Sequence, residues 1–478
     1  VLAAGELAFI SSGWRKAILE LKDMGLVSER EVLAVKASMP SSSVEPQLNT
    51  EQIKAIESVL ALTNTFKPWL LHGITGSGKT EVYIQILRQV LQQTTIDKIG
   101  AQTIGAQVLV LVPEINLTPQ LEARFRSRLS QYPLVTLHSN LSESERLQNW
   151  QGASTGAAKI VIGTRLSVFT PMPNLKLIVM DEEHDGSYKQ QDGMRYHARD
   201  VAMVRAKQLN IPIVLGSATP SLETWANAKK NQYGLLSLKQ RAVENSALPN
   251  IFCIDTAKSP TENGLSPLLV KALRERLSKG EQSLLFLNRR GYAPVLHCNA
   301  CQWASSCTRC SAKLVVHLSQ KRLKCHHCGA EQKIPLQCPS CGNADIRPVG
   351  QATQRLEQTL QTLLPTARIA RVDRDSMRSK DALTDMLASV HAGEVDILVG
   401  TQMLAKGHDF PNLTLVAVLD TDSALYSPDF RASEKLFAQL MQVSGRAGRA
   451  EKAGEVLIQT AFPQHALFDA LRAQNYER

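Results

Sequence analysis

The stretch LLHGITGSGKTEVY, residues 70–83, decides the fold of the first half of the chain. It contains the pattern G-x-x-x-x-G-K-T, directly after an apolar run and directly before a helical pattern. Glycines in this context let backbone N–H groups curl around an anion, and the helix N-terminus adds a favourable dipole. The stretch therefore predicts a phosphate-binding loop between a strand and a helix. Its predicted members are Gly73, Thr75, Gly76, Ser77, Gly78, Lys79 and Thr80.

An acidic motif, LIVMDEEH at residues 177–184, supplies the carboxylates that such a loop requires. Lys79 is expected to reach the β- and γ-phosphates of ATP, and Thr80 and Asp181 to hold Mg²⁺. Glu182 is expected to orient and deprotonate the attacking water. Carboxylates at a strand end could also form a solvated turn, but the phosphate loop favours the catalytic interpretation.

Short apolar runs that end in polar motifs alternate with helical patterns in two parts of the chain. This alternation predicts parallel sheets wrapped by helices, and therefore an α/β fold of two RecA-like lobes. Residues 92–107 are polar and contain several glycines, so we expect a surface loop there. The runs are VLVLVPE (108–114), IVIGTR (160–165), LIVMDEEH (177–184) and IVLGSATP (213–220), and then SLLFLNRRG (283–291), DILVGTQ (396–402), LVAVLDTD (415–422) and EVLIQT (455–460).

The domain boundaries are predicted from this alternation of apolar runs and helical patterns. Trp14, Ile18 and Leu21 repeat at helical spacing near the start of the chain, which suits a winged-helix remnant. The first residue is Val1 rather than Met, so we expect a fragment of a longer protein. The predicted domains are 1–40 (winged-helix remnant), 41–232 (first lobe, ATP-binding), 233–296 and 346–478 (second lobe), and 297–345 (a cysteine-rich insertion after the first strand of the second lobe).

The motif QVSGRAGRA, residues 442–450, places Arg446 and Arg449 on one face of a helix. A planar, permanently charged guanidinium suits the charge that builds on a transferring phosphoryl group. If the two lobes face each other, these arginines can close on ATP bound to the first lobe. A basic surface helix, or an arginine that holds nucleic acid, is the alternative.

Eight of the nine cysteines form four Cys-x-x-Cys pairs inside the insertion. In a reducing compartment such pairs are metal ligands rather than disulfides, and eight thiolates make two tetrahedral zinc sites. Residues 311–324 have the pattern of strand, turn and strand, so a hairpin would bring the second and third pairs together. This favours nested sites over sequential or crossed pairing. The inner site is Cys307, Cys310, Cys325 and Cys328, and the outer site is Cys298, Cys301, Cys338 and Cys341.

The overall charge favours an anionic partner. Lys and Arg exceed Asp and Glu by 54 − 44 = 10, which indicates nucleic acid before a membrane surface. No apolar run approaches the ~18 residues of a membrane span. We therefore expect no membrane partner, no signal peptide and a cytoplasmic location.

Taken together, the motifs resemble those of superfamily 2 DNA helicases. The further motifs are LNTEQ (48–52), DGSYKQQDGMRYHARD (185–200), GSATPSLET (216–224) and GTQMLAKGHDFPNL (400–413). With the cysteine insertion after FLNRRGYAP (286–294), the chain is similar to the PriA family of bacterial replication-restart helicases (primosomal protein N′) from about residue 48 to its end. From this resemblance we expect the chain to be a fragment without the family's N-terminal 3′-end-binding domain and its C-terminal domain.

This resemblance implies an ATP-dependent 3′→5′ DNA helicase that remodels stalled replication forks and initiates primosome assembly. It implies single-stranded and forked DNA, PriB, DnaT and single-strand-binding protein as partners, and a location at the bacterial nucleoid. The zinc insertion would part strands or dock a partner, or would be purely structural. Two alternative functions stay open: a duplex DNA translocase that does not separate strands, and a non-catalytic zinc scaffold. The intact motor residues Lys79, Asp181, Glu182 and Arg449 argue against the scaffold.

The resemblance also implies roles for individual residues. Gln52 would recognise adenine, while Gly407 and Asp409 would face the nucleotide from the second lobe. His184, Ser217 and Thr219 would link the nucleotide state to lobe movement. The 185–200 segment would sense single-stranded DNA by stacking and charge, and Met194 stands where members of the family have tryptophan. The predicted DNA contacts are Tyr188 and Tyr196 on bases, Lys189 and Arg195 on phosphates, and Thr164, Arg165, Thr401 and Gln402 on the backbone.

Overall fold

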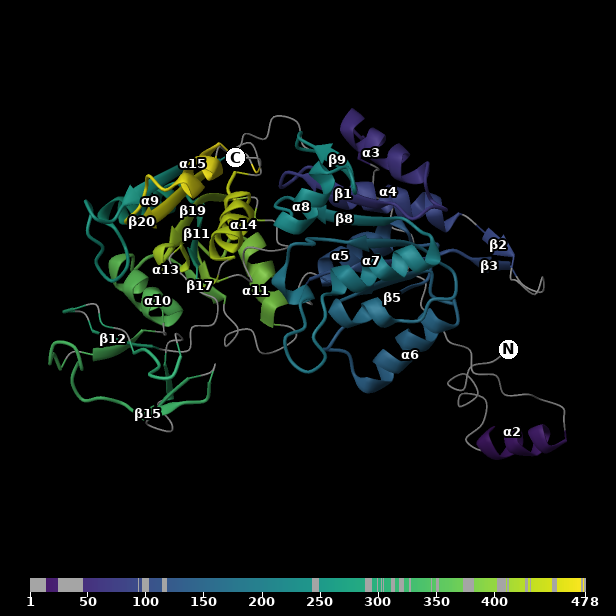
Figure 1. The fold of residues 1–478 in the computed structure, drawn as a ribbon, viewed down its shortest axis with the longest axis horizontal. Coiled ribbons are helices and arrows are strands. Elements are labelled where there is room, and N and C mark those ends of the chain that lie inside the picture. Colours follow the sequence, from purple (N-terminus) through teal and green to yellow (C-terminus); the bar gives the residue numbers. More distant parts are fainter. Residues whose placement is uncertain are drawn as a thin grey trace.

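The structure is a computed structural model of the chain. It places two α/β lobes side by side, with a small cysteine-rich module next to the second lobe (Figure 1). The first lobe carries the purple to teal colours of Figure 1, and most of the second lobe is green and yellow. The structure describes residues 14–24, 46–92, 94–96, 103–113, 118–242, 249–288, 295–298, 300–301, 303, 305–310, 314–317, 322–325, 328–344, 346–349, 352–372, 382–401, 410, 412–425, 429, 431–448, 454–473 and 476.

A seven-stranded parallel sheet forms the centre of the first lobe. Its inner strands β4 and β8 are buried along their whole length, which explains why they read as continuous apolar runs. Across the sheet the strands are β5 (Leu134–Leu137), β6 (Ile160–Gly163), β4 (Gln107–Leu111), β7 (Leu175–Met180), β8 (Ile213–Ser217), β1 (Pro68–Gly73) and β9 (Gly234–Leu238).

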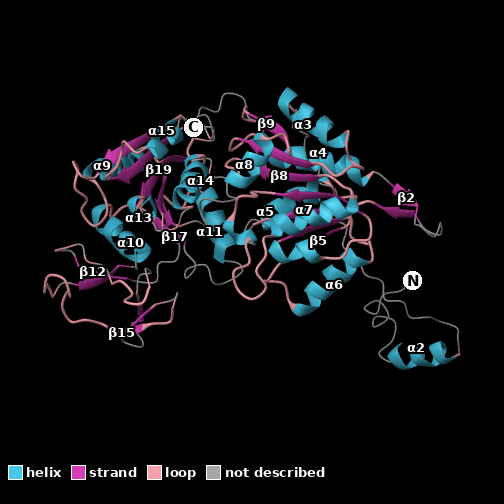
Figure 2. Cartoon of the chain, viewed as in Figure 1, coloured by secondary structure: helices cyan, strands magenta, loops and turns pink. Residues whose placement is uncertain are grey.

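Helices cover both faces of this sheet and create an apolar core on each side (Figure 2). α4 buries Val82, Ile86 and Val90 in one core, at the spacing of a single helical face. α7 buries Ala198, Ala202 and Ala206 in the other. The helical segments are α3 (Thr50–Leu60), α4 (Lys79–Leu91), α5 (Thr118–Arg128), α6 (Glu143–Ser154), η2 (Arg165–Phe169), η3 (Gly186–Tyr188), α7 (Ala198–Leu209) and α8 (Leu222–Lys229).

β9 extends the first lobe further along the chain than the sequence predicted. It pairs in parallel with β1, from Trp69↔Gly234 to Gly73↔Leu238. The predicted boundary at residue 232 is therefore wrong, and the first lobe continues at least to Leu238. The run GLLSL of β9 ends in no polar motif of the kind that marks the other strands, so the pattern did not reveal it.

The predicted second α/β lobe is confirmed, with a six-stranded parallel sheet at its centre. The sequence predicted that the cysteine-rich insertion follows the first strand of this lobe. This prediction is wrong, because β10 precedes β11 in the chain and the module therefore follows the second strand. The strands in order are β10 (Asn250–Asp255), β20 (Glu455–Thr460), β19 (Leu413–Leu419), β11 (Gln282–Leu287), β18 (Ile397–Gly400) and β17 (Ile369–Val372). The described helices are α9 (Pro267–Ser278), α10 (Ala352–Leu363), α11 (Ala382–His391), α13 (Asp422–Leu425), α14 (Ala432–Ser444) and α15 (Ala466–Arg472).

The cysteine-rich module is built on its own antiparallel sheet. The predicted hairpin is confirmed, because β13 and β14 pair from Val315↔Lys324 to His317↔Arg322. β12 pairs with β16 at the base, so the module spans 295–349 and the predicted limits 297–345 are too narrow. The strands in order are β15 (Glu331–Lys333), β14 (Arg322–Lys324), β13 (Val315–His317), β12 (Val295–Cys298) and β16 (Ile346–Val349).

Two small units lie outside these sheets. α2 (Trp14–Asp23) is a described part of the predicted winged-helix remnant and lies apart from the lobes in Figure 1; most of residues 1–40 falls outside the described part of the chain. β2 (Thr94–Ile96) and β3 (Thr103–Gly105) pair with each other, so the predicted surface loop contains a hairpin instead. None of the described helices is long and apolar enough to cross a membrane.

Gly216, in β8, leaves the space that the side chain of Tyr83 fills. A Cβ atom at this position would lie 1.6 Å from Tyr83 Oη and 2.8 Å from Cζ, and Tyr83 is buried. We expect Gly216→Ala to lower the free energy of unfolding of the first lobe by about 2–3 kcal/mol through overpacking. Urea denaturation measures this loss. The double variant Gly216→Ala/Tyr83→Phe, which removes the nearest oxygen, should recover part of the stability, and an unchanged urea midpoint for Gly216→Ala would contradict the packing.

Candidate functional site

The phosphate loop connects the end of β1 to the start of α4, as predicted. Gly76 and Gly78 have φ values of 82° and 81°, a conformation that glycine adopts at low cost. The Lys79 ammonium donates a hydrogen bond of 2.8 Å to the Gly73 carbonyl, which holds it against the loop. Ser77 is buried, and its hydroxyl has no hydrogen-bond partner among the described residues. The loop therefore offers a compact cradle with a cation and a free hydroxyl.

Gln52 lies directly on this loop. It occupies the first turn of α3, where its Oε1 accepts a hydrogen bond from the Asn49 N–H in a capping box. Its Nε2 donates to the Ser77 carbonyl at 2.9 Å, and the side chain is buried. The implied role in reading adenine stays a prediction, and the structure adds a link between this glutamine and the loop backbone.

Asp181 and Glu182 follow the end of β7, beside the phosphate loop. Burial and the neighbouring Glu182 charge raise the pKa of Asp181 to about 6, although Lys79 and the Tyr83 hydroxyl both act to lower it. Tyr83 Oη donates to Asp181 Oδ1 at 3.0 Å. Burial, with the charges of Asp181 and Glu182, raises the pKa of Tyr83, so this phenol stays a neutral donor. A carboxylate next to a phosphate cradle is a suitable ligand for Mg²⁺.

The second lobe touches this site through the C-terminal end of α14. Gln442 Nε2 lies 3.2 Å from His184 Nε2 and 3.5 Å from Glu182 Oε2. His184 Nδ1 lies 2.8 Å from Ser217 Oγ, at the end of β8. Gly445 lies so close to the phosphate loop that a Cβ there would be 2.7 Å from Thr75 Cγ2. The acidic motif, the end of β8, the phosphate loop and the C-terminal end of α14 therefore meet at one junction between the lobes.

Not every predicted nucleotide residue can be placed at this junction. Arg446 is buried and follows Gly445, which itself contacts the phosphate loop. Arg449, Gly407, Asp409 and the predicted DNA contact Gln402 lie outside the described residues, so their roles stay predictions.

In the 185–200 segment the structure contradicts one predicted DNA contact, Tyr188, and the other contacts stay predictions. Tyr188 was expected to stack on bases, but its side chain is 0% exposed within the core of the first lobe, and its hydroxyl donates to the Asp181 carbonyl at 2.7 Å. The prediction for Tyr188 is wrong, because the η3 turn directs this ring under the acidic motif. Lys189 and Arg195 are exposed, and Met194 is exposed to 77%.

A second segment, η2, supports this loop. Arg165 Nη1 donates to the Ser187 and Lys189 carbonyls at 2.9 and 3.1 Å, so this arginine holds the loop in place. The ring of Tyr196 contacts Phe169 edge to face, with centroids 5.1 Å apart. Phe169 is itself half exposed and was missed by the sequence reasoning, although it lies only four residues after the quoted run IVIGTR (160–165). Thr164 and Thr401 are both partly exposed, and their DNA contacts stay predictions.

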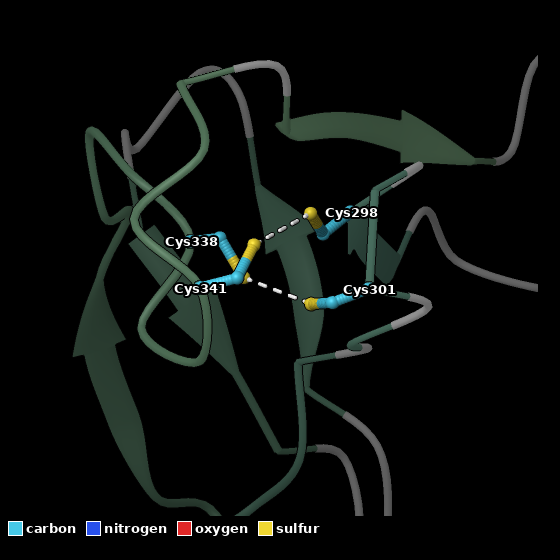
Figure 3. Close-up of side chains that lie close together, drawn as sticks. All are labelled: Cys298, Cys301, Cys338 and Cys341. Carbon is cyan, nitrogen blue, oxygen red and sulfur yellow. Dashed lines mark hydrogen bonds between the residues drawn. The ribbon is translucent and has the colours of Figure 1, made fainter.

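The cysteines form the two predicted nested clusters. In the outer cluster, Cys298 lies 3.6 Å from Cys341 and Cys301 lies 3.6 Å from Cys338, between sulfur atoms (Figure 3). In the inner cluster, the sulfur atoms of Cys307 and Cys328 are 3.5 Å apart and those of Cys310 and Cys325 are 3.6 Å apart. A tetrahedral zinc site with Zn–S bonds of ~2.3 Å has S···S edges of ~3.8 Å. The residues therefore fit two zinc ions.

The last pair of each cluster sits in the same kind of turn. The backbone carbonyl of Cys325 accepts a hydrogen bond from the Gly329 N–H, and the carbonyl of Cys338 accepts one from the Gly342 N–H, both at 2.9 Å. Gly329 and Gly342 have φ values of 76° and 74°, so each glycine lets the chain turn directly after its second cysteine. The four thiolates in each cluster leave no ligand position for a substrate, which indicates structural zinc.

These features define a two-lobe helicase fold with a zinc-binding insertion in the second lobe. Residues 49–228 match the DEAD/DEAH box helicase family, and residues 349–451 match the helicase conserved C-terminal domain. Residues 307–333 match the PriA DNA helicase Cys-rich region domain.

Curated relatives narrow this class to one family. The chain is 49% identical over 430 residues to replication restart protein PriA of Haemophilus influenzae, covering 90% of this chain and 57% of that protein. It is 40% identical over 455 residues to replication restart protein PriA of Rickettsia prowazekii, covering 95% of this chain and 68% of that protein. The chain belongs to the PriA family of replication restart proteins. It spans little more than half the length of the Haemophilus relative.

Solved structures support the fold alone. The Mycobacterium smegmatis helicase Lhr bound to ssDNA and AMP-PNP is similar with a TM-score of 0.53 at 15% identity, over 89% of this chain and 48% of that one.

The two cysteine clusters predict the metal content of the chain. We expect two zinc ions per chain by elemental analysis, because each cluster supplies four thiolates. Cys328→Ser should lower the content to about one, since the outer cluster keeps its ligands. Cys253→Ser is the matched control and should leave the content unchanged, because Cys253 lies in β10, away from both clusters. A single zinc ion in the unaltered chain would contradict the nested assignment.

Proposed function

We propose that this chain is the motor portion of an ATP-dependent 3′→5′ DNA helicase that remodels stalled replication forks and initiates primosome assembly. The observation that carries the proposal is the junction between the lobes. There the phosphate loop and Glu182 of the first lobe meet Gln442 and Gly445 at the end of α14. Motor action requires that hydrolysis and lobe movement depend on each other, and this junction makes that dependence possible.

In the proposed reaction, the chain's own groups bind, orient and accept a proton. Lys79 exchanges its bond to the Gly73 carbonyl for phosphate oxygens, and the loop N–H groups bind the same phosphates. Glu182 accepts the proton of the attacking water, and Arg446 and Arg449 stabilise the charge on the transferring group. Thr80 and Asp181 would hold Mg²⁺, which supplies positive charge to the phosphate oxygens. Gln52, Gly407 and Asp409 complete the nucleotide site.

DNA binding is proposed for the surface formed by the 185–200 segment and η2. Lys189 and Arg195 present exposed cations there, and Tyr196 with Phe169 presents an aromatic pair. Cations bind backbone phosphates, and aromatic rings stack on unpaired bases. The motifs at Thr164, Arg165, Thr401 and Gln402 are proposed to hold the backbone as the lobes move.

The cysteine-rich module is proposed to part strands or to dock a partner at the fork. It lies next to the second lobe, away from the nucleotide site, and its metal would be structural (Figure 1). PriB, DnaT and single-strand-binding protein are the proposed partners, at the nucleoid in the bacterial cytoplasm. A duplex translocase would share the motor but would release no single strand, so a strand-displacement assay on forks with a 3′ or a 5′ tail distinguishes the two functions.

Lys79 and Glu182 predict different defects in ATP hydrolysis. We expect hydrolysis to be stimulated by single-stranded DNA and to be lost in Lys79→Ala. Glu182→Gln should still bind ATP but lower the turnover rate by about 100-fold or more, because removing a general base typically costs 10²–10⁴-fold. Fluorescent-nucleotide binding and phosphate release measure the two steps separately. Normal turnover in Glu182→Gln would exclude this residue as the base, and DNA-stimulated hydrolysis in Lys79→Ala would contradict the assigned phosphate site.

The raised pKa of the Asp181 carboxyl leads us to expect that ATP turnover depends on pH. The Tyr83 hydroxyl lowers the pKa of Asp181, so Tyr83→Phe should raise that pKa further above about 6. Because a protonated carboxyl does not hold Mg²⁺, turnover on acidification should fall at a pH about half a unit higher in the variant. The pH profile of turnover at sub-saturating Mg²⁺ tests this, with nucleotide-free unfolding as the folding control. Coincident profiles would show that Tyr83 does not set the Asp181 charge.

A further inference from the structure

The acidic motif holds a third carboxylate, Glu183, that faces away from the nucleotide site. Glu183 is fully buried, and its Oε2 lies 3.2 Å from Nη1 of Arg199. The same carboxylate accepts hydrogen bonds from the Ser221 N–H at 2.6 Å and from the Thr224 hydroxyl at 2.9 Å. Arg199 Nη1 also donates to Ser221 Oγ at 2.6 Å. We call Glu183, Arg199, Ser221 and Thr224 the Glu183 cluster.

The charges in the Glu183 cluster are balanced and held in one geometry. Burial alone would lower the pKa of Arg199, but the charges of Glu183 and Asp200 raise it, so the guanidinium remains charged. Buried ion pairs contribute little net stability, whereas their loss leaves an uncompensated charge. The cluster therefore serves to fix the relative positions of the segments that carry its members.

On one side, Arg199 fixes the base of the proposed DNA-sensing loop. Residues 189–197 form a tight hairpin, in which Lys189 pairs with His197 and the Gln190 N–H donates to the Tyr196 carbonyl. His197 caps α7, and its Nδ1 accepts the Arg199 N–H at 3.3 Å. Burial, with the Arg199 charge, lowers the pKa of His197 to about 4, so the ring is neutral and can accept this bond. His197 therefore joins the end of the hairpin directly to Arg199.

On the other side, the cluster reaches the second lobe through the first turn of α8. Ser221 is the N-cap of α8, and its neighbour Leu222 donates its N–H to Glu434 Oε1 of α14 at 3.1 Å. Glu223 forms an ion pair with Arg431, also from the second lobe. The proposed base Glu182 precedes Glu183 directly. One rigid cluster thus connects the hairpin, the catalytic motif and the start of α14.

Arg199 also faces the space between the lobes. A cavity of about 890 Å³ lies there, and Lys189, His197 and Arg199 line it together with Glu434 and Tyr476. Tyr476 donates its hydroxyl to the Pro220 carbonyl, next to Ser221. A strand bound at the hairpin would thus lie beside the wall that contains the cluster.

We propose that Arg199 is a positioning residue that transmits DNA binding at the 189–197 hairpin, through Glu183, to Glu182 and to the α8–α14 contact. This inference rests on the proposed function, because it assumes that DNA binds at the hairpin and that Glu182 acts as the base. In this role Arg199 acts through Glu183 and takes no part in the chemical step itself. Its effect is to set how strongly bound DNA accelerates hydrolysis.

The test measures ATP hydrolysis with and without DNA in a variant that removes the charges of Glu183 and Arg199 together. Arg199→Gln alone leaves Glu183 buried without its counter-charge, so the double variant Glu183→Gln/Arg199→Gln is the primary variant. We expect the ratio of stimulated to unstimulated turnover to fall by about tenfold, a value within the usual range for coupling between sites. DNA affinity, measured by fluorescence anisotropy, should change by less than about twofold, because the exposed contacts of Lys189 and Arg195 remain. Lys207→Gln, an exposed cation on the same helix, is the matched control.

Two further variants separate positioning from folding. Arg199→Lys keeps the charge, but it loses the guanidinium Nε that donates to Asp200 and the planar geometry that holds Nη1 between Glu183 and Ser221, so it should give an intermediate ratio. If the double variant does not fold, the ratio in Arg199→Lys decides the question. A purely structural role would lower both turnovers together and leave their ratio unchanged, which would overturn the proposal. If the unaltered chain shows no DNA stimulation at all, the proposed function itself fails.

Discussion

The site depends on the neighbouring positions of β7, β8 and β1 in one parallel sheet. Because all three strands run in the same direction, their carboxyl ends meet at one edge, where ligands bind in folds of this type. The acidic motif, the segment after Ser217 and the phosphate loop therefore come together, although the phosphate loop precedes the other two by about 100 residues or more in the sequence. Phosphate binding, proton transfer to Glu182 and the contact with the second lobe are all proposed to occur at this edge.

The second lobe contacts this edge of the sheet through the end of a helix, α14, and not through a strand. α14 presents Gln442 to Glu182 and His184, and it brings Gly445 against Thr75. Further along, the start of α14 contacts α8 through Glu434 and Arg431. One helix thus contacts both the proposed nucleotide site and the α8 segment beside the proposed DNA-binding hairpin. A rigid helix in this position can relate the two sites without any change in its own structure.

The sequence predicted the parts of the molecule whose chemistry is local. The phosphate loop is marked by glycines whose φ values require them, and the cysteine pairing follows from a hairpin in the sequence between the pairs. Tyr188 was predicted wrongly because the exposure of a loop tyrosine depends on packing that no short pattern encodes. β9 was missed for a similar reason, because this short edge strand is stabilised by its pairing with β1, which the sequence of β9 alone does not indicate. The partners of Glu183 lie 16, 38 and 41 residues away, so only the fold brings them together.

The measurement that tests this account most directly is ATP turnover in Gly445→Val. Gly445 has a φ of −65°, so its backbone accepts a side chain, but a Cβ there would lie 2.7 Å from the phosphate loop. If the junction of the lobes assembles the site, this variant should bind fluorescent nucleotide on the first lobe normally and lose about 100-fold or more in DNA-stimulated turnover. Turnover equal to that of the unaltered chain would contradict the claim that hydrolysis requires contact between α14 and the phosphate loop.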